Sequence, residues 1–143
     1  MEYHKYRKEA KEKKMTKPKV FISFDFDNDS DLRDFLVGQS KNPDSPFEIQ
    51  DYSLKEPLSG DWKEKIKTRI RRCEQVIVLC GHKTDTATGV DIELRITQEE
   101  RKSYFLLAGR KEGENKSPKS SLSTDKMYKW TWENLKLLIQ GQR

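Results

Sequence analysis

Cysteine is scarce in this sequence, and the placement of the few cysteines excludes two common roles. The 143 residues contain two cysteines, Cys73 and Cys80, which are too far apart to form a C-x-x-C pair. No cluster of histidine and cysteine has the spacing of zinc ligands, so the sequence predicts no metal site. Because the two cysteines flank a short apolar run, we expect reduced thiols in the core of a cytoplasmic protein.

Long hydrophobic runs and glycine-rich loops are also missing. No apolar segment has the length of a membrane span or of a secretory signal, so we expect no membrane partner. No stretch resembles a phosphate-binding loop, no set of serine, histidine and aspartate converges by position, and no internal repeat is visible. A mechanism that uses a single carboxylate is the chemistry that the sequence most plainly offers.

The excess of positive charge is confined to one end of the chain. The net charge is +5, and residues 1 to 19 hold 8 basic and 3 acidic residues, whereas the rest of the chain holds 21 of each kind. We therefore interpret residues 1–17 as a basic N-terminal tail and residues 18–143 as one domain. Because the domain itself has no excess of basic residues, we expect no nucleic-acid partner.

Short apolar runs between polar segments predict alternating strands and helices. Strands are predicted at residues 20–24, 47–52, 75–80 and 103–109, and helices at residues 30–38, 62–73 and about 130–139. The continuous run at 75–80 is typical of a central parallel strand that is covered on both faces, whereas 47–52 alternates like an outer strand. Residues 111–126 are rich in Lys, Ser, Gly and Glu and are expected to form a loop.

The segment 89–96 fits two kinds of structure. Its apolar and charged residues alternate as in a strand, but Val90 and Leu94 are also one helical turn apart. Thr88 and Asp91 have the spacing of a capping box at the start of a helix. We favour a helix here. Strands that alternate with helices then imply right-handed crossovers, and the predicted fold class is α/β, a flavodoxin-like three-layer fold with a mostly parallel central sheet.

Four aspartates at alternate positions follow the first predicted strand. They are Asp25, Asp27, Asp29 and Asp31. A calcium-binding EF-hand loop that began at Asp25 would need Gly and Glu where Ser30 and Leu36 stand. A magnesium-dependent phosphatase built on Asp25 and Asp27 remains a minor alternative. These aspartates also suit a simpler role, in which they cap the next helix and fill a turn, with Asp29 or Ser30 as the cap.

Polar residues that follow strands mark the edge of the sheet where α/β proteins bind their ligands. The candidates for ligand contacts on this basis are Asp25, Asp51, Tyr52 and His82. Glu93 lies just inside the helix that follows the most buried predicted strand, so its carboxylate is the foremost candidate for chemistry. Trp62 begins an amphipathic helix and is interpreted as a packing anchor.

Three segments of this chain carry a resemblance to a known family. They are Val20-Phe-Ile-Ser-Phe24, the run from Trp62 through Ile66 and Ile70 to Val76-Ile-Val-Leu-Cys-Gly-His-Lys-Thr84, and Val90-Asp-Ile-Glu-Leu94. Over about residues 18 to 110 the chain resembles the TIR-like family of bacterial antiphage defence, in particular the TIR-like protein of Thoeris systems. The family commonly has Trp-Val-x-x-Glu at the third segment. Val90 and Glu93 match this pattern, and Gly89 stands in place of the tryptophan.

The resemblance implies a TIR-like domain at 18–143 and an enzyme that cleaves NAD⁺ as its substrate, without a further cofactor. It implies that Glu93 is the catalytic residue, and we expect Ser23, Phe24 and Asp25 to help enclose the dinucleotide. The product implied is a cyclic isomer of ADP-ribose that reaches a separate effector as a diffusible signal. The alternative is a non-catalytic interaction module of the same fold, which self-associates or docks a partner.

Overall fold

All strands of the central sheet run parallel. The computed structural model describes residues 17–53 and 60–143, so the predicted basic tail lies outside the described residues except for Lys17. The five strands of the described part are β1 (Lys19–Ser23), β2 (Glu48–Tyr52), β3 (Gln75–Cys80), β4 (Ser103–Ala108) and β5 (Met127–Lys129). Their spatial order is β2-β1-β3-β4-β5. As predicted, β2 lies at an edge and β3 at the centre.

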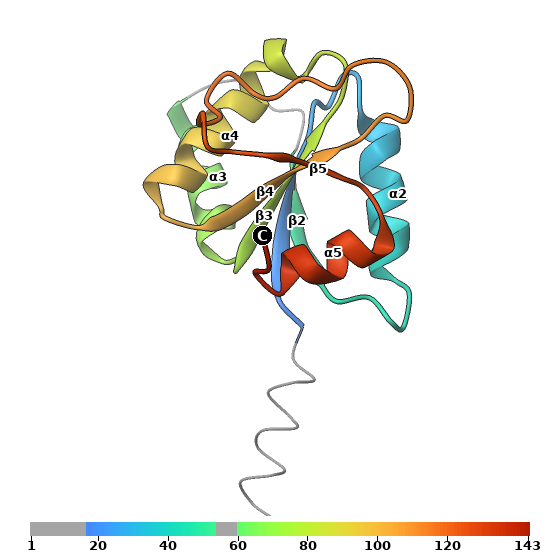
Figure 1. Ribbon diagram of the computed structural model, residues 1–143. Coiled ribbons are helices and arrows are strands. Elements are labelled where there is room, and N and C mark those ends of the chain that lie inside the picture. Colours follow the sequence, from blue (N-terminus) through green and yellow to red (C-terminus); the bar gives the residue numbers. More distant parts are fainter. Residues whose placement is uncertain (1–16, 54–59) are drawn as a thin grey trace, which may run out of the picture.

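Helices cover both faces of this sheet. The helices of the described part are α2 (Ser30–Ser40), α3 (Gly60–Arg71), α4 (Thr88–Glu99) and α5 (Trp132–Ile139), with a short 3-10 helix, η1 (Thr84–Thr86). Figure 1 shows α2 and α5 on one face of the sheet and α3 and α4 on the other. This arrangement confirms the predicted three-layer α/β fold. Among the described residues, no helix combines the length and the apolar character needed to cross a bilayer.

Strand β3 contributes to the apolar core on both faces of the sheet, because side chains of successive residues in a strand point to opposite faces. All six of its residues are buried. Ile77 and Leu79 pack with apolar residues of α2 and α5, whereas Val76 and Val78 pack with those of α3 and α4. A continuous apolar run is therefore the pattern that this position requires.

Both cysteines are buried and unpaired, as predicted. Burial raises the pKa of the Cys73 and Cys80 thiols to about 12. At neutral pH they are therefore inert core residues.

Strand β5 was not predicted from the sequence, and helix α5 begins later than expected. Strand β5 pairs with β4 through only three residues, from Leu106 opposite Met127 to Ala108 opposite Lys129. So short a strand at an edge carries no alternation that could identify it. Helix α5 begins at Trp132, two residues later than expected, and the Thr131 hydroxyl accepts a hydrogen bond from the backbone of Asn134 at 3.0 Å.

The predicted capping interactions are wrong at two helices. Residues 88–99 form a helix, as favoured, but Ala87 occupies the N-cap position and no side chain caps the helix. At α2, Asp29 occupies the N-cap position without a capping hydrogen bond. Its carboxylate instead accepts a hydrogen bond from Arg110 at 2.9 Å, because the turn that contains Arg110 packs against the start of α2.

Candidate functional site

A pocket of about 330 Å³ opens at the carboxyl ends of β1 and β2. From β1 the chain runs to β2 on one side and then crosses to β3 on the other, so the strand order reverses at this point of the sheet. Open α/β sheets bind ligands at such a switch point. The lining residues come from the ends of these strands, from α3 and from the start of α4; they include Phe24, Asp25, Ser53, Trp62, Gly89 and Glu93.

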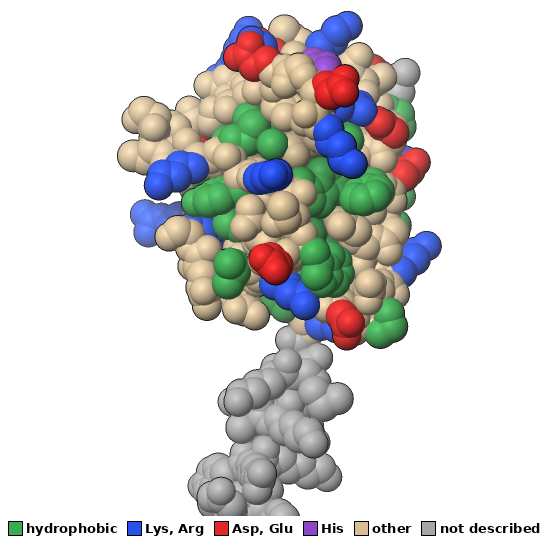
Figure 2. Space-filling model, turned by 45° about the vertical axis from the view of Figure 1, so that its right-hand side comes forward, with side chains coloured by type: hydrophobic (Ala, Val, Ile, Leu, Met, Phe, Trp, Pro, Cys, Tyr) green, Lys and Arg blue, Asp and Glu red, His purple; other side chains and the backbone are tan. Residues whose placement is uncertain are grey.

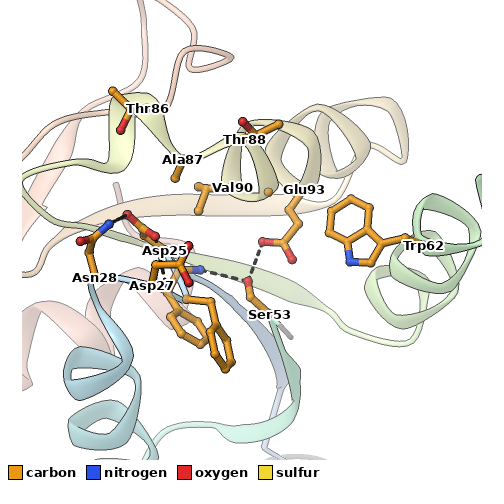
Figure 3. A pocket seen from close by; sticks show the side chains of 13 residues that line it. Asp25, Asp27, Asn28, Ser53, Trp62, Thr86, Ala87, Thr88, Val90 and Glu93 are labelled. Carbon is orange, nitrogen blue, oxygen red and sulfur yellow. Dashed lines mark hydrogen bonds between the residues drawn. The ribbon is translucent and has the colours of Figure 1, made fainter. Parts of the chain in front are cut away.

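Glu93 lies in the second turn of α4 and is 1% exposed. Its Oε1 accepts hydrogen bonds from the hydroxyls of Ser23 and Ser53, each at 2.6 Å. The Ser53 hydroxyl in turn accepts a hydrogen bond from the backbone of Phe24 at 3.1 Å. The carboxylate is therefore fixed to the ends of both β1 and β2, and Figure 3 shows it directed toward Ser53, beside Trp62. Its Oε2 is buried and has no hydrogen-bond partner.

Burial controls the ionisation of Glu93. Removal from water raises the pKa of this carboxyl to about 7, against the opposing effect of the two serine hydroxyls. The charge of Arg69 also lowers the pKa of Glu93, and that of Asp51 raises it. A pocket carboxyl that titrates near neutrality is a candidate for a functional group, because it can change its protonation state under physiological conditions.

Three of the residues predicted to contact substrate lie in or directly behind this pocket. Phe24 and Asp25 line it, and Ser23 lies behind it and bonds to Glu93. Both carboxylate oxygens of Asp25 accept hydrogen bonds within its own turn, Oδ1 from the backbone of Asp27 at 3.2 Å and Oδ2 from the Asn28 side chain at 2.7 Å. Asp25 thus shapes the loop that borders the pocket.

The other three predicted contact residues do not line the pocket. Asp51 forms an ion pair with Arg69 at 3.2 Å. The Tyr52 ring lies 4.8 Å from the guanidinium of Arg33. His82 is exposed, and its Nε2 lies 2.7 Å from the backbone oxygen of Glu112. A position directly after a strand was therefore not sufficient to predict a pocket residue, because successive side chains at a strand end point in different directions.

Comparison with known proteins identifies the family of this chain. The family model for the TIR-like domain of the Thoeris protein ThsB matches residues 21–116, which span β1 to the segment after β4. The chain belongs to this TIR-like family. No curated protein matches the chain. Membership of the Thoeris TIR-like family supports a role in antiphage defence.

Ser53 and Trp62 are among the pocket residues of this TIR-like domain that were not assigned to the site from sequence. Ser53 is the residue directly after the second predicted strand, and its position at that strand end was the available signal. Trp62 packs in the apolar cluster on the α3 and α4 side, as expected of a packing anchor, but it also forms part of the pocket wall. A stripe of apolar residues along a helix cannot reveal such a double role.

Gly89 widens the pocket of this TIR-like domain. A Cβ atom at this position would have no neighbouring heavy atom within 4 Å. The start of α4 is therefore open at the position where the family pattern has a tryptophan. Trp62 lies beside Glu93 in the wall of the same pocket.

The acidic loop after β1 does not form a metal-binding group. Within residues 17–53 and 60–143, no three His, Cys, Asp or Glu side chains are placed to share a metal ion. Since both oxygens of Asp25 bond within their own turn, the geometry gives no support to a phosphatase that uses this residue as a nucleophile.

Proposed function

We propose that this TIR-like domain cleaves NAD⁺ at the nicotinamide glycosidic bond, with Glu93 as the catalytic carboxylate. The observation that carries the proposal is the state of Glu93. One oxygen is fixed by two hydroxyls, and the other is buried without a partner in the wall of a pocket at the switch point of the sheet. A polar atom that is buried and unpartnered is uncommon, and a ligand can satisfy it.

The reaction suits a site with a single carboxylate. The bond between C1′ of the ribose and the nicotinamide nitrogen breaks, its electron pair leaves with nicotinamide, and positive charge develops on the ribose. Nicotinamide departs as a neutral molecule, so no general acid is needed. A fixed carboxylate in a pocket shielded from water stabilises the developing charge strongly. Ser23 and Ser53 hold the carboxylate in place, so little reorganisation accompanies the reaction.

The start of α4 supports the binding of a dinucleotide. Thr88, Gly89 and Val90 line the pocket, and no side chain caps the helix above them. Free backbone N–H groups and the positive end of the helix dipole favour phosphate oxygens. The diphosphate of NAD⁺ would lie here, with the nicotinamide ribose toward Glu93.

After nicotinamide leaves, the ribose carbon accepts either water or a nitrogen of the adenine ring of the same molecule. We propose the second course, which yields a cyclic ADP-ribose isomer that diffuses to a separate effector in the cytoplasm. Self-association of the domain would provide a route by which a trigger switches on this activity.

The test compares nicotinamide release from NAD⁺ by the wild type, Glu93→Gln and Glu99→Gln. Glu99 is an exposed carboxylate on the same helix and serves as a matched control. Each protein is assayed alone and after addition of lysate from phage-infected cells, and the products are separated chromatographically. We expect release by the wild type and Glu99→Gln, with loss of at least about a hundredfold for Glu93→Gln. Equal rates for the wild type and Glu93→Gln would refute the mechanism.

A non-catalytic interaction module is the second candidate, and one observation favours it. A groove of about 820 Å³ between α2 and β5 is bordered by Phe35, which is 60% exposed, and by Trp130. Figure 2 shows hydrophobic side chains gathered on this face, among basic and acidic ones. This function predicts that Glu93→Gln still protects cells from phage and that no new ADP-ribose species forms on infection.

A further inference from the structure

Two polar atoms in the wall of the Glu93 pocket lack hydrogen-bond partners. Besides Oε2 of Glu93, the indole Nε1 of Trp62 is buried and unpartnered. Of the described side-chain atoms that share this state, only these two belong to residues that line the pocket. The wall of this pocket therefore holds one hydrogen-bond donor and one acceptor that no protein group satisfies.

The indole nitrogen of a buried tryptophan ordinarily has a partner. Nε1 can only donate a hydrogen bond, and leaving a buried donor unsatisfied costs about 1 to 3 kcal/mol. Trp130 shows the usual arrangement in this same protein, because its Nε1 donates to the side chain of Gln39 at 2.8 Å. Trp62 is 3% exposed, so water does not replace the missing partner freely.

The geometry of the pocket limits what could satisfy both atoms. Trp62 offers a donor and Glu93 offers an acceptor, and Figure 3 shows the indole and the carboxylate beside one another. A hydroxyl group accepts through its lone pairs and donates through its proton, so a hydroxyl, or two on neighbouring carbons, complements the pair. A phosphate group does not, because it has no proton to donate to an ionised carboxylate and would be repelled by it.

We propose that the indole N–H of Trp62 donates a hydrogen bond to a hydroxyl of the bound ribose whose bond is cleaved, while Glu93 Oε2 accepts from the same diol. Trp62 is then a substrate-binding residue that orients the ribose toward the carboxylate. This inference rests on the proposed function for the identity of the ribose. Because Trp62 lies on α3, which packs against α4, both helices contribute to the choice of substrate.

The open space at Gly89 is consistent with this arrangement. Apart from its chain neighbours and the backbone of its own helix, no heavy atom lies within 4 Å of a Cβ placed at Gly89, so the pocket is open at the start of α4. The apolar contacts of the Trp62 ring with Ile66 and the rest of its cluster fix the ring plane and therefore the direction of the N–H bond. Fixed donors bind with a smaller loss of entropy than mobile ones.

The direct test observes the indole protons of the wild-type protein by nuclear magnetic resonance. The chain contains three tryptophans, and Trp62→Phe identifies the signal of Trp62. The probes are ADP-ribose, which has the terminal ribose, ADP, which lacks it, and nicotinamide alone. We expect ADP-ribose to shift the Trp62 signal downfield, whereas ADP and nicotinamide leave it in place. A Trp62 signal that does not move at saturating ADP-ribose, or the absence of ADP-ribose binding, overturns the proposal. A shift with nicotinamide also overturns it, because a carboxamide would then be the partner.

Affinities measured by calorimetry provide the second readout. Trp62→Phe keeps an aromatic ring and removes the donor, and the loss of one hydrogen bond should weaken ADP-ribose binding about five- to tenfold without changing ADP binding. Trp130→Phe is the control and should change neither affinity, since Trp130 lies on the other side of the sheet. Equal weakening for ADP and ADP-ribose would mean that Trp62 only shapes the pocket, and the proposal would fail.

The two proposals can fail separately. If ADP-ribose shifts the Trp62 signal but no condition yields nicotinamide from NAD⁺, the ribose site stands and the proposed activity does not. If NAD⁺ is cleaved while the Trp62 signal stays in place in ADP-ribose, the activity stands and the role of Trp62 is wrong.

Discussion

Replacement of Glu93 by Gln should stabilise the protein at alkaline pH, although it removes the proposed catalytic group. In the folded protein, burial raises the pKa of Glu93 to about 7, from 4.5 for an ordinary glutamate. The folded state therefore binds this proton more tightly than the unfolded chain does. The stability that results is fully present below pH 4.5 and is lost as the pH rises through about 7. Gln carries no such proton, so the stability of Glu93→Gln lacks this dependence.

The magnitude follows from the shift in pKa. A difference of one pKa unit corresponds to about 1.4 kcal/mol, so raising the pH from 5 to 8 should cost the wild type about 2 to 3 kcal/mol relative to Glu93→Gln. For a domain of this size, this corresponds to roughly 5 to 10 °C in melting temperature. Gln keeps the shape of the protonated carboxyl and an oxygen that can accept from Ser23 and Ser53. The two proteins should therefore differ little at pH 5.

The assay is urea unfolding of the wild type, Glu93→Gln and Glu99→Gln between pH 5 and 8, followed by circular dichroism. The difference between the wild type and Glu93→Gln isolates Glu93, because all other titrating groups are common to both. Glu99→Gln, at an exposed position of the same helix, should differ from the wild type by a nearly constant amount. A difference between the wild type and Glu93→Gln that stays constant from pH 5 to 8 would show that Glu93 is not held in a desolvated site.

Two further substitutions test how the site and the fold are held. Ser53→Ala removes a hydroxyl that lowers the pKa of Glu93, so the acid limb of the pH profile of nicotinamide release should move to higher pH. Ser53→Thr keeps a hydroxyl and should restore the wild-type profile. An acid limb that does not move in Ser53→Ala would contradict the role assigned to Ser53. Arg110→Met removes the guanidinium that binds the carboxylates of Asp29 and Asp31. Because Asp29 is buried, the free energy of unfolding measured in urea should fall by about 2 kcal/mol. A decrease below about 0.5 kcal/mol would refute this reasoning.

Local patterns were sufficient for much of the fold. The continuous apolar run at Gln75–Cys80 predicted a central strand, and the structure confirms it, since apolar residues on both faces of a strand can only be buried between two layers. In the segment 88–99, by contrast, local patterns did not distinguish a strand from a helix. Alternation and helical spacing were both present there, and packing of Val90 and Leu94 against the sheet selected the helix.

The candidate site could be predicted only in part. Glu93 was singled out by its place after the central strand, and the resemblance to the TIR-like family then implied a catalytic role for it. Tyr52 and His82 were predicted on the same ground of following a strand, yet neither lines the pocket. The direction of a side chain at a strand end depends on the twist of the sheet and on the loops that follow, and neither can be derived from the sequence alone.

The sequence by itself determined the order and type of the main elements and the TIR-like family, and it gave Glu93 as the candidate carboxylate, because hydrophobic periodicity and short motifs are local properties. Only the tertiary structure decided what surrounds that carboxylate. Ser23 and Ser53, 70 and 40 residues away from Glu93 in the chain, meet its Oε1, and Trp62 approaches from a neighbouring helix. The pKa of Glu93 likewise depends on burial, which arises only when these distant segments pack together and exclude water.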